Sequence, residues 1–277
     1  MADIVISPPR SRSQTVAART LDLTVKFWFS VTVIGQWVFV YYLSAYYISR
    51  ILTGGMAALA ETRLPGGYVA GDTIGNLVVT LHLFVAVIII GLGPLQFIPS
   101  VQRLFPKVHR WNGRLYIVIS ILTSLAGLHM TWVRGDNIGN FVQHVAVTLN
   151  AALIIIFAIM AWRSALERDF KAHRRWALRL FMVVSAVWLL RIGYQLWNLL
   201  NNGVINYDPA VFRSNFMMLW NFGQYLLPLL MLELYLFVQH HASMHGQLLF
   251  AVILFVATVL TCLGIYTAAF GMWLPRL

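Results

Sequence analysis

The chain has 277 residues, of which 60% are hydrophobic and only 10% are charged, and its formal net charge is +11. A soluble domain of this length carries about 25% charged residues, so the composition excludes a soluble fold. The basic residues lie in short segments between long apolar runs. This distribution is typical of a membrane protein that meets anionic lipid, and we expect no nucleic acid as a partner.

Seven apolar runs can cross a bilayer, because one span needs about 20 mainly apolar residues. In chain order they cover residues 27–48, 74–98, 115–132, 142–162, 176–200, 216–238 and 248–270. Residues 1–26 are polar and basic and lack a signal-peptide cleavage site, so they predict an N-terminal tail. The expected fold class is all-α: a polytopic membrane helical bundle of about seven helices, with residues 27–277 as a single transmembrane domain.

Lysine and arginine orient this bundle. One set of connecting segments is rich in both, whereas the opposite set holds only a few arginines, namely Arg50, Arg63, Arg134, Arg213 and Arg276. The positive-inside rule places the rich set in the cytoplasm. We therefore expect a multi-pass membrane protein with a cytoplasmic N-terminus.

Two of the basic segments resemble each other. Residues 105–120 read FPKVHRWNGRLYIVIS, and residues 170–185 read FKAHRRWALRLFMVVS. With one residue skipped in each, Phe, Lys, His, Arg, Trp, Arg, Leu and Ser align in order. The series predicts a repeated helix-hairpin core over residues 74–200, in which helices two–three and four–five are parallel copies. The alternative is that both segments share only the composition of a membrane interface.

Ionisable side chains inside a membrane are costly, so they are functional candidates. His82, Arg191 and Glu233 lie inside expected spans. At 1.5 Å per residue, His82 and Arg191 lie about 12 and 14 Å from the outer ends of their helices, so they predict a polar pocket in the outer half of the bundle. Glu233 is either a proton-relay carboxylate or a structural hydrogen-bond partner, for example of Tyr225.

The other histidines divide by membrane face. His129 and His144 are expected near the outer surface with His82, whereas His109 and His173 are expected at the cytoplasmic ends of their helices. Paired imidazoles, one pair per leaflet, are the arrangement that holds two stacked b-type haems. The haem-iron candidates are therefore His82 with His144 and His109 with His173. Each inner histidine has the alternative of capping a helix or binding a phosphate, and residues 240–245, HHASMH, favour a solvated loop over a metal site.

The order of these motifs resembles a known family. His82, the Gly-Pro-Leu-Gln-Phe run at Gly93–Phe97, residues 109–116, residues 173–176 and Arg191 are similar to the pattern of the bacterial integral membrane family catalogued as domain of unknown function 2306. The resemblance covers about the middle half of the chain. It implies a protein of the bacterial inner membrane in which these residues form a set, but it implies no activity. His144 lies outside the pattern. More distantly, the arrangement resembles di-haem cytochrome b and ferric-reductase-like membrane proteins.

Three functional hypotheses follow. The first is a b-type-haem-like electron-transfer or quinone-interacting protein, with His82, His109, His129, His144, His173 and Arg191 as cofactor-binding residues. The second is a non-catalytic subunit or assembly factor of a larger respiratory or photosynthetic membrane complex. The third is a small-molecule or lipid carrier that works through the outer polar pocket. The sequence leaves open whether the protein is an enzyme.

Overall fold

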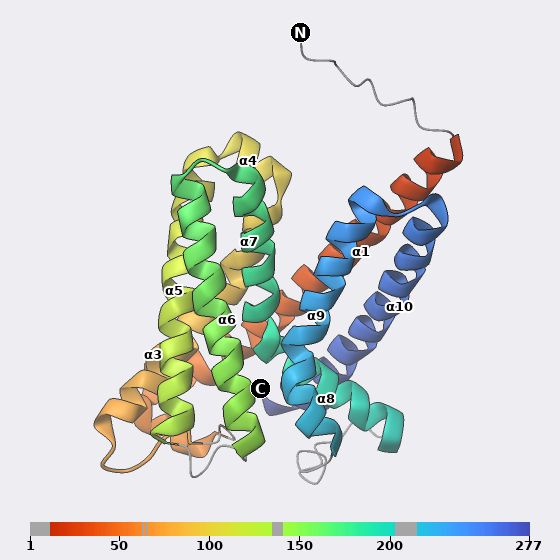
Figure 1. The fold of residues 1–277 in the computed structure, drawn as a ribbon. Helices are drawn as coiled ribbons and strands as arrows, with labels where there is room; N and C mark the ends of the chain where they lie inside the picture. Colours follow the sequence, from red (N-terminus) through yellow and green to blue (C-terminus); the bar gives the residue numbers. More distant parts are fainter. Residues whose placement is uncertain (1–11, 63, 65, 135–140, 203–214) are drawn as a thin grey trace.

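The computed structural model describes residues 12–62, 64, 66–134, 141–202 and 215–277. Every regular element in this part of the chain is a helix, and none is a strand. The long helices lie side by side as a bundle, and shorter segments connect them at both ends (Figure 1). The expected all-α class is confirmed.

Within the described residues, eight longer helices form the bundle: α1 (Arg12–Tyr42), α3 (Thr73–Leu92), α5 (Pro106–Trp132), α6 (Phe141–Leu166), α7 (Phe170–Val184), α8 (Ala186–Asn202), α9 (Asn215–His241) and α10 (Met244–Ala268). Short helical segments join or extend them: η1 (Leu43–Ile48), α2 (Ser49–Gly54), η2 (Met56–Glu61), η3 (Gly93–Phe97), α4 (Pro99–Leu104), η6 (Ala269–Trp273) and η7 (Leu274–Arg276). Of these, η1 and η6 are π-helical, whereas η2, η3 and η7 are 3₁₀ helices.

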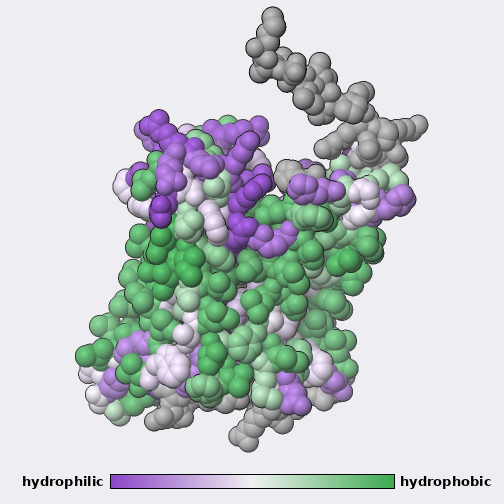
Figure 2. Space-filling model, in the orientation of Figure 1, coloured by the Kyte–Doolittle hydropathy of each residue, from purple (hydrophilic) through white to green (hydrophobic). Residues whose placement is uncertain are grey.

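Six helices within the described residues are long and apolar enough to cross a membrane, and the bent pair α7–α8 makes a seventh if it counts as one span. The surface shows the same pattern, with a broad hydrophobic band between two more polar ends (Figure 2). Hydrophilic side chains gather most densely at the end that carries α4 and the start of α7, which we call the basic end (Figures 1 and 2). A multi-pass membrane protein is therefore confirmed.

The first helix starts well before the apolar run that begins at residue 27. Residues 12–26, which the sequence assigned to the N-terminal tail, belong to α1. On this extension Leu21 is buried in a cluster with Val238 and Phe250 of α9 and α10, and Lys26 pairs with Asp22 at 2.6 Å. Such a mixed polar and apolar extension has too little average hydropathy to be recognised as part of a span, so the helix starts earlier than the apolar run that the sequence shows.

The fifth expected span is not one straight helix. α7 ends at Val184, α8 starts at Ala186, and the two are bent by 48°. Between them the Ser185 hydroxyl donates to the Phe181 carbonyl at 2.8 Å and accepts from Gln36 Nε2 at 2.9 Å. Serine bonds of this type to the preceding turn bend helices. The predicted single helix over residues 176–200 is therefore two helices, with Arg191 on the second of them.

The structure supports the internal repeat at its two helix starts. His109 is the fourth residue of α5, and His173 is the fourth residue of α7. Each copy also places an arginine over a tryptophan three residues earlier: Arg114 Cζ lies 5.2 Å from the Trp111 ring centroid, and Arg179 Cζ lies 4.7 Å from that of Trp176. The copies diverge at the aligned serines, because α5 continues through Ser120 whereas α7 ends before Ser185.

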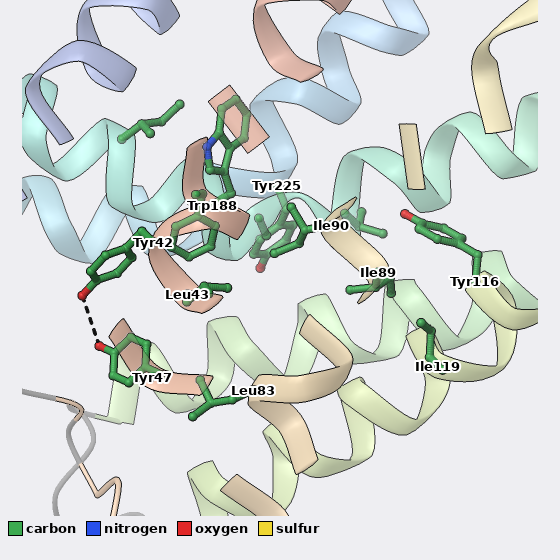
Figure 3. Packing of buried hydrophobic residues seen from close by; sticks show 14 of the residues in the cluster. Tyr42, Leu43, Tyr47, Leu83, Ile89, Ile90, Tyr116, Ile119, Trp188 and Tyr225 are labelled. Carbon is green, nitrogen blue, oxygen red and sulfur yellow. Dashed lines mark hydrogen bonds between the residues drawn. The ribbon is translucent and has the colours of Figure 1, made fainter. Parts of the chain in front are cut away.

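The bundle core contains large aromatic side chains and glycines that let backbones approach. Trp188 of α8, Tyr225 of α9 and Tyr42 of α1 are buried in the largest core cluster (Figure 3). On α10, a Cβ atom added at Gly264 would lie 2.9 Å from the Ile192 carbonyl oxygen of α8. Small residues at such crossings are a usual device of membrane helix packing.

We expect Gly264→Ala to destabilise the protein, because its new methyl group meets backbone rather than a flexible side chain. Overpacking of this kind lowers the free energy of unfolding by about 1–3 kcal/mol. The matched control is Gly127→Ala on α5, where an added Cβ has no heavy atom within 4 Å. The thermal midpoint of the purified protein in detergent measures both variants. Equal midpoints would contradict a close α8–α10 crossing.

Candidate functional site

Arg191 on α8 lies among titratable side chains from the first and last parts of the chain. It interacts electrostatically with Tyr47 of η1, Tyr42 of α1 and Arg276 of η7. His82 of α3 is also within electrostatic reach of Arg191. We call these five residues the Arg191 cluster. The bend at Ser185 turns α8 across the lower end of α9 and α10, away from the line of α7 (Figure 1).

The tyrosines of this cluster face inward because of the local helix geometry. Tyr42 closes α1, and Tyr46 and Tyr47 lie in the π-helical segment η1; all three are buried. Trp273, in the second π-helical segment η6, stacks on Tyr42 with ring centroids 6.0 Å apart. π-Helical turns occur frequently at functional sites. Here η1 contributes Tyr47 to the Arg191 cluster, and η6 contributes Trp273, which stacks on Tyr42 of that cluster.

Hydrogen bonds connect the C-terminal arginine with the tyrosines. Arg276 Nη1 donates to Tyr42 Oη at 3.4 Å, and Tyr42 Oη donates to Tyr47 Oη at 3.4 Å. Figure 3 shows the two hydroxyl groups facing each other. A phenol can accept and donate at once, so Tyr47, which accepts from Tyr42, still has its own O–H as a donor.

Arg191 has an unbalanced positive charge. Its Nη1 donates to the Val187 carbonyl at 2.9 Å, and its Cζ lies 5.2 Å from the Phe39 ring centroid. In the described part of the chain no carboxylate forms an ion pair with Arg191. A guanidinium group carries five N–H donors, so most of them remain to be satisfied by an acceptor outside these contacts.

His82 adds an acceptor to the cluster. Its ring faces the backbone of Thr123 on α5, whereas its Nδ1 atom is buried and has no hydrogen-bond partner. Buried polar atoms are as a rule hydrogen-bonded. Nδ1 of His82 is therefore an atom that a ligand hydroxyl group would satisfy.

The structure does not bring His82 and His144 together as facing ligands. His144 lies against Trp132, with ring centroids 5.3 Å apart. Trp132 is nine residues beyond Thr123 on α5, which corresponds to about 13 Å along the helix axis. His129 lies between these levels, and its Nδ1 is also buried without a partner. This separation does not fit an outer pair of imidazoles on one haem iron.

The inner histidines interact electrostatically with each other, but each ring already has a hydrogen-bond partner. His173 Nδ1 lies 2.9 Å from the Ala161 carbonyl oxygen, so this nitrogen carries the proton and Nε2 keeps the lone pair. The Gln96 amide, in the orientation that satisfies all its neighbours, donates to His109 Nδ1 at 2.9 Å. His109 therefore carries its proton on Nε2. The pair offers one lone pair and one N–H, which suits a hydrogen bond better than haem ligation.

Glu233 has a structural partner. Arg179 Nε donates to Glu233 Oε1 at 2.7 Å, and Arg179 Nη2 donates to Oε2 at 2.8 Å. This bidentate ion pair joins α7 to α9. Tyr225, which the sequence suggested as the partner, has a buried hydroxyl without a hydrogen bond in the described structure. The structural alternative for Glu233 is therefore favoured over the proton relay.

The sequence missed three members of the Arg191 cluster. Tyr42 and Tyr47 belong to the run YYLSAYY, which looks like an interfacial aromatic belt, and Arg276 lies next to the C-terminus. The sequence carries no signal that would place these residues beside Arg191, because they are far from it along the chain. In the described residues no group of three His, Cys, Asp or Glu side chains could hold a metal ion. The side chain of His240, in the HHASMH segment, lies outside the described part of the structure.

A comparison with protein families places the chain. The family described as "Predicted membrane protein (DUF2306)" matches residues 79–221, just over half of the sequence. The chain belongs to this family. The matched part of this DUF2306 protein contains His82, His109, His173 and Arg191, whereas Tyr42, Tyr47 and Arg276 lie outside it. Comparison with curated proteins and with solved structures gives no significant match.

The geometry of the two histidine pairs predicts that this DUF2306 protein binds no b-type haem. We expect protein purified from haem-replete cells to show no Soret band, because neither pair presents two imidazole lone pairs to one iron. A pyridine haemochrome assay on the same membranes controls for haem supply. A Soret band that shifts on dithionite reduction, and is lost in a folded His109→Ala, His173→Ala double variant, would contradict the expectation.

Proposed function

We propose that this protein binds an amphiphile with an oxygen-bearing head, a quinone or quinol in the first place, at the Arg191 cluster. The observation that carries the proposal is the state of Arg191, a half-buried guanidinium without an ion-pair carboxylate among the described residues. Ionisable groups inside a membrane are by default functional, and an acceptor group on a ligand satisfies this one.

The donor and acceptor pattern favours a quinone-type head over a simple anion. Arg191 and Tyr47 supply N–H and O–H donors for a carbonyl or anionic oxygen. His82 Nδ1, which lacks a partner, accepts from a hydroxyl group, as a quinol presents. A carboxylate or phosphate head would satisfy the arginine and leave the histidine atom unpaired. A quinone ring also stacks on aromatic side chains, and Phe39 and Trp273 lie beside the cluster with ring centroids 5.0 Å apart.

The test is the quinone content of the purified protein. We expect the wild type to retain quinone through mild-detergent purification, measured by organic extraction and chromatography. Arg191→Leu removes a charge-assisted hydrogen bond worth about 1.5–3 kcal/mol, so binding weakens roughly tenfold to a hundredfold. Arg191→Lys keeps the charge but lacks the forked set of donors, so we expect its quinone content to lie between those of the wild type and Arg191→Leu.

Two further variants make this result specific. Arg163→Gln on α6 is the matched control, because the Arg163 side chain is 65% exposed and pairs only with Glu167. His82→Phe is expected to lower quinone content while leaving bound anionic lipid unchanged. If folded Arg191→Leu retains quinone at the wild-type level, the proposed site is wrong; if it loses anionic lipid rather than quinone, the ligand class is wrong.

We further infer that the basic end faces the cytoplasm of a bacterial cell, because the positive-inside rule orients short basic loops in this way. In a Cys262→Ser background, Ala60→Cys marks the opposite end and Ser100→Cys marks the basic end; both positions are exposed. A membrane-impermeant maleimide is expected to label residue 60 but not residue 100 in spheroplasts. The reverse pattern would overturn this orientation. Permeabilised cells, in which both are labelled, are the control.

A further inference from the structure

The start of α7 forms a pocket at the basic end of the bundle. The pocket has a volume of about 320 Å³ and is lined by Asp169, Lys171, Ala172, Arg175, Trp176 and Arg179. It lies where hydrophilic side chains gather on the surface, beside the hydrophobic band (Figure 2). None of its residues belongs to the Arg191 cluster.

Three cations of the pocket share one face of α7. Lys171, Arg175 and Arg179 are spaced four residues apart, which places them one above the other on a helix. Arg179 is fixed by its two hydrogen bonds to Glu233. In the described part of the chain, Lys171 and Arg175 form no ion pair with a carboxylate. The pocket therefore holds three positive charges. Glu233 neutralises that of Arg179, whereas those of Lys171 and Arg175 have no ion-pair partner among the described residues.

The acidic residue at the pocket has another role. The Asp169 side chain accepts from the Ala172 backbone N–H at 3.0 Å and so caps the first turn of α7. Among the described residues Asp169 forms no ion pair with Lys171 or Arg175, so both cations are available to a ligand. A phosphate oxygen is a good acceptor for both groups.

The pocket also has an apolar border, which distinguishes it from a purely aqueous basic surface. Trp176 is half-buried, with its ring 5.7 Å from that of Phe157. Leu166 and Phe170, at the turn between α6 and α7, are 70% and 69% exposed. Tryptophan and exposed apolar side chains beside a basic cluster are typical of the headgroup level of a membrane.

From this combination we propose that the α7 pocket binds the phosphate of an anionic phospholipid from the leaflet at the basic end. Lys171 and Arg175 contact the phosphate, Arg179 is held in place by Glu233, and the acyl chains lie along the exposed apolar residues of α6 and α7. A free phosphate ion offers the same oxygen atoms but makes no use of the apolar border.

The internal repeat supplies a control within the same protein. Lys107, Arg110 and Trp111 on α5 occupy the positions that Lys171, Arg174 and Trp176 occupy on α7, and Arg175 is the residue without a counterpart. Trp111 is 69% exposed, whereas Trp176 packs against α6. The two segments thus have similar charge and sequence but different surroundings.

The experiment is a titration of the full-length protein in detergent with phosphatidylglycerol, followed by native mass spectrometry. We expect Lys171→Gln, Arg175→Gln to weaken phosphatidylglycerol binding roughly thirtyfold, because each basic residue near a membrane surface contributes about one factor of five. Lys107→Gln, Arg110→Gln removes the same charge and is expected to bind like the wild type. Phosphatidylcholine is the lipid control.

Three outcomes would overturn the proposal. Equal weakening in both double variants would show a general basic surface rather than a site. Displacement of phosphatidylglycerol by millimolar inorganic phosphate would show a site for the free ion. Unchanged binding in Lys171→Gln, Arg175→Gln, with an unchanged thermal midpoint, would show that the lipid binds elsewhere. Arg191→Leu retains phosphatidylglycerol binding if the two proposed sites are independent, so failure of one does not imply failure of the other.

Discussion

The structure depends on the cost of an unpaired polar group in a hydrocarbon environment. Backbone groups are satisfied within helices, which is why the described residues form helices throughout. Some polar side chains pair across helices, as Gln36 does with Ser185 and Arg179 with Glu233, and many hydroxyl groups donate to a carbonyl one turn back in their own helix. Within the Arg191 cluster, the Arg191 guanidinium forms no ion pair among the described residues and the buried His82 Nδ1 has no hydrogen-bond partner, which is why we propose a ligand there.

The repeat explains how the cluster comes together. α5 and α7 start at equivalent residues and carry the same arginine–tryptophan contact, but only the second copy bends at its serine. The partner of that serine is Gln36 on α1, outside the repeat. The bend turns α8 toward the first and last segments of the chain, so Arg191 meets Tyr47 and Arg276 instead of continuing along the axis of α7.

The arginines of the two proposed sites have different partners and therefore different roles. Arg179 is neutralised by Glu233, so it stabilises the packing of α7 on α9 and fixes the wall of the lipid pocket. Arg191 has two tyrosines, a histidine and a second arginine around it, and among the described residues no carboxylate forms an ion pair with it. Arg179 and Arg191 belong to the same bent span, so their different roles follow from whether a carboxylate partner is present.

The sequence by itself determined the all-α multi-pass fold, the family and the residues His82 and Arg191, because hydropathy over about 20 residues and charged groups within apolar runs are local signals. The tertiary structure decided the rest. The extension of α1 depends on packing against α9 and α10, and the bend at Ser185 depends on Gln36, far away in the sequence. The cluster joins Tyr42 with Arg276 across nearly the whole chain. Such contacts leave no periodic pattern, since they arise only when distant helices pack together.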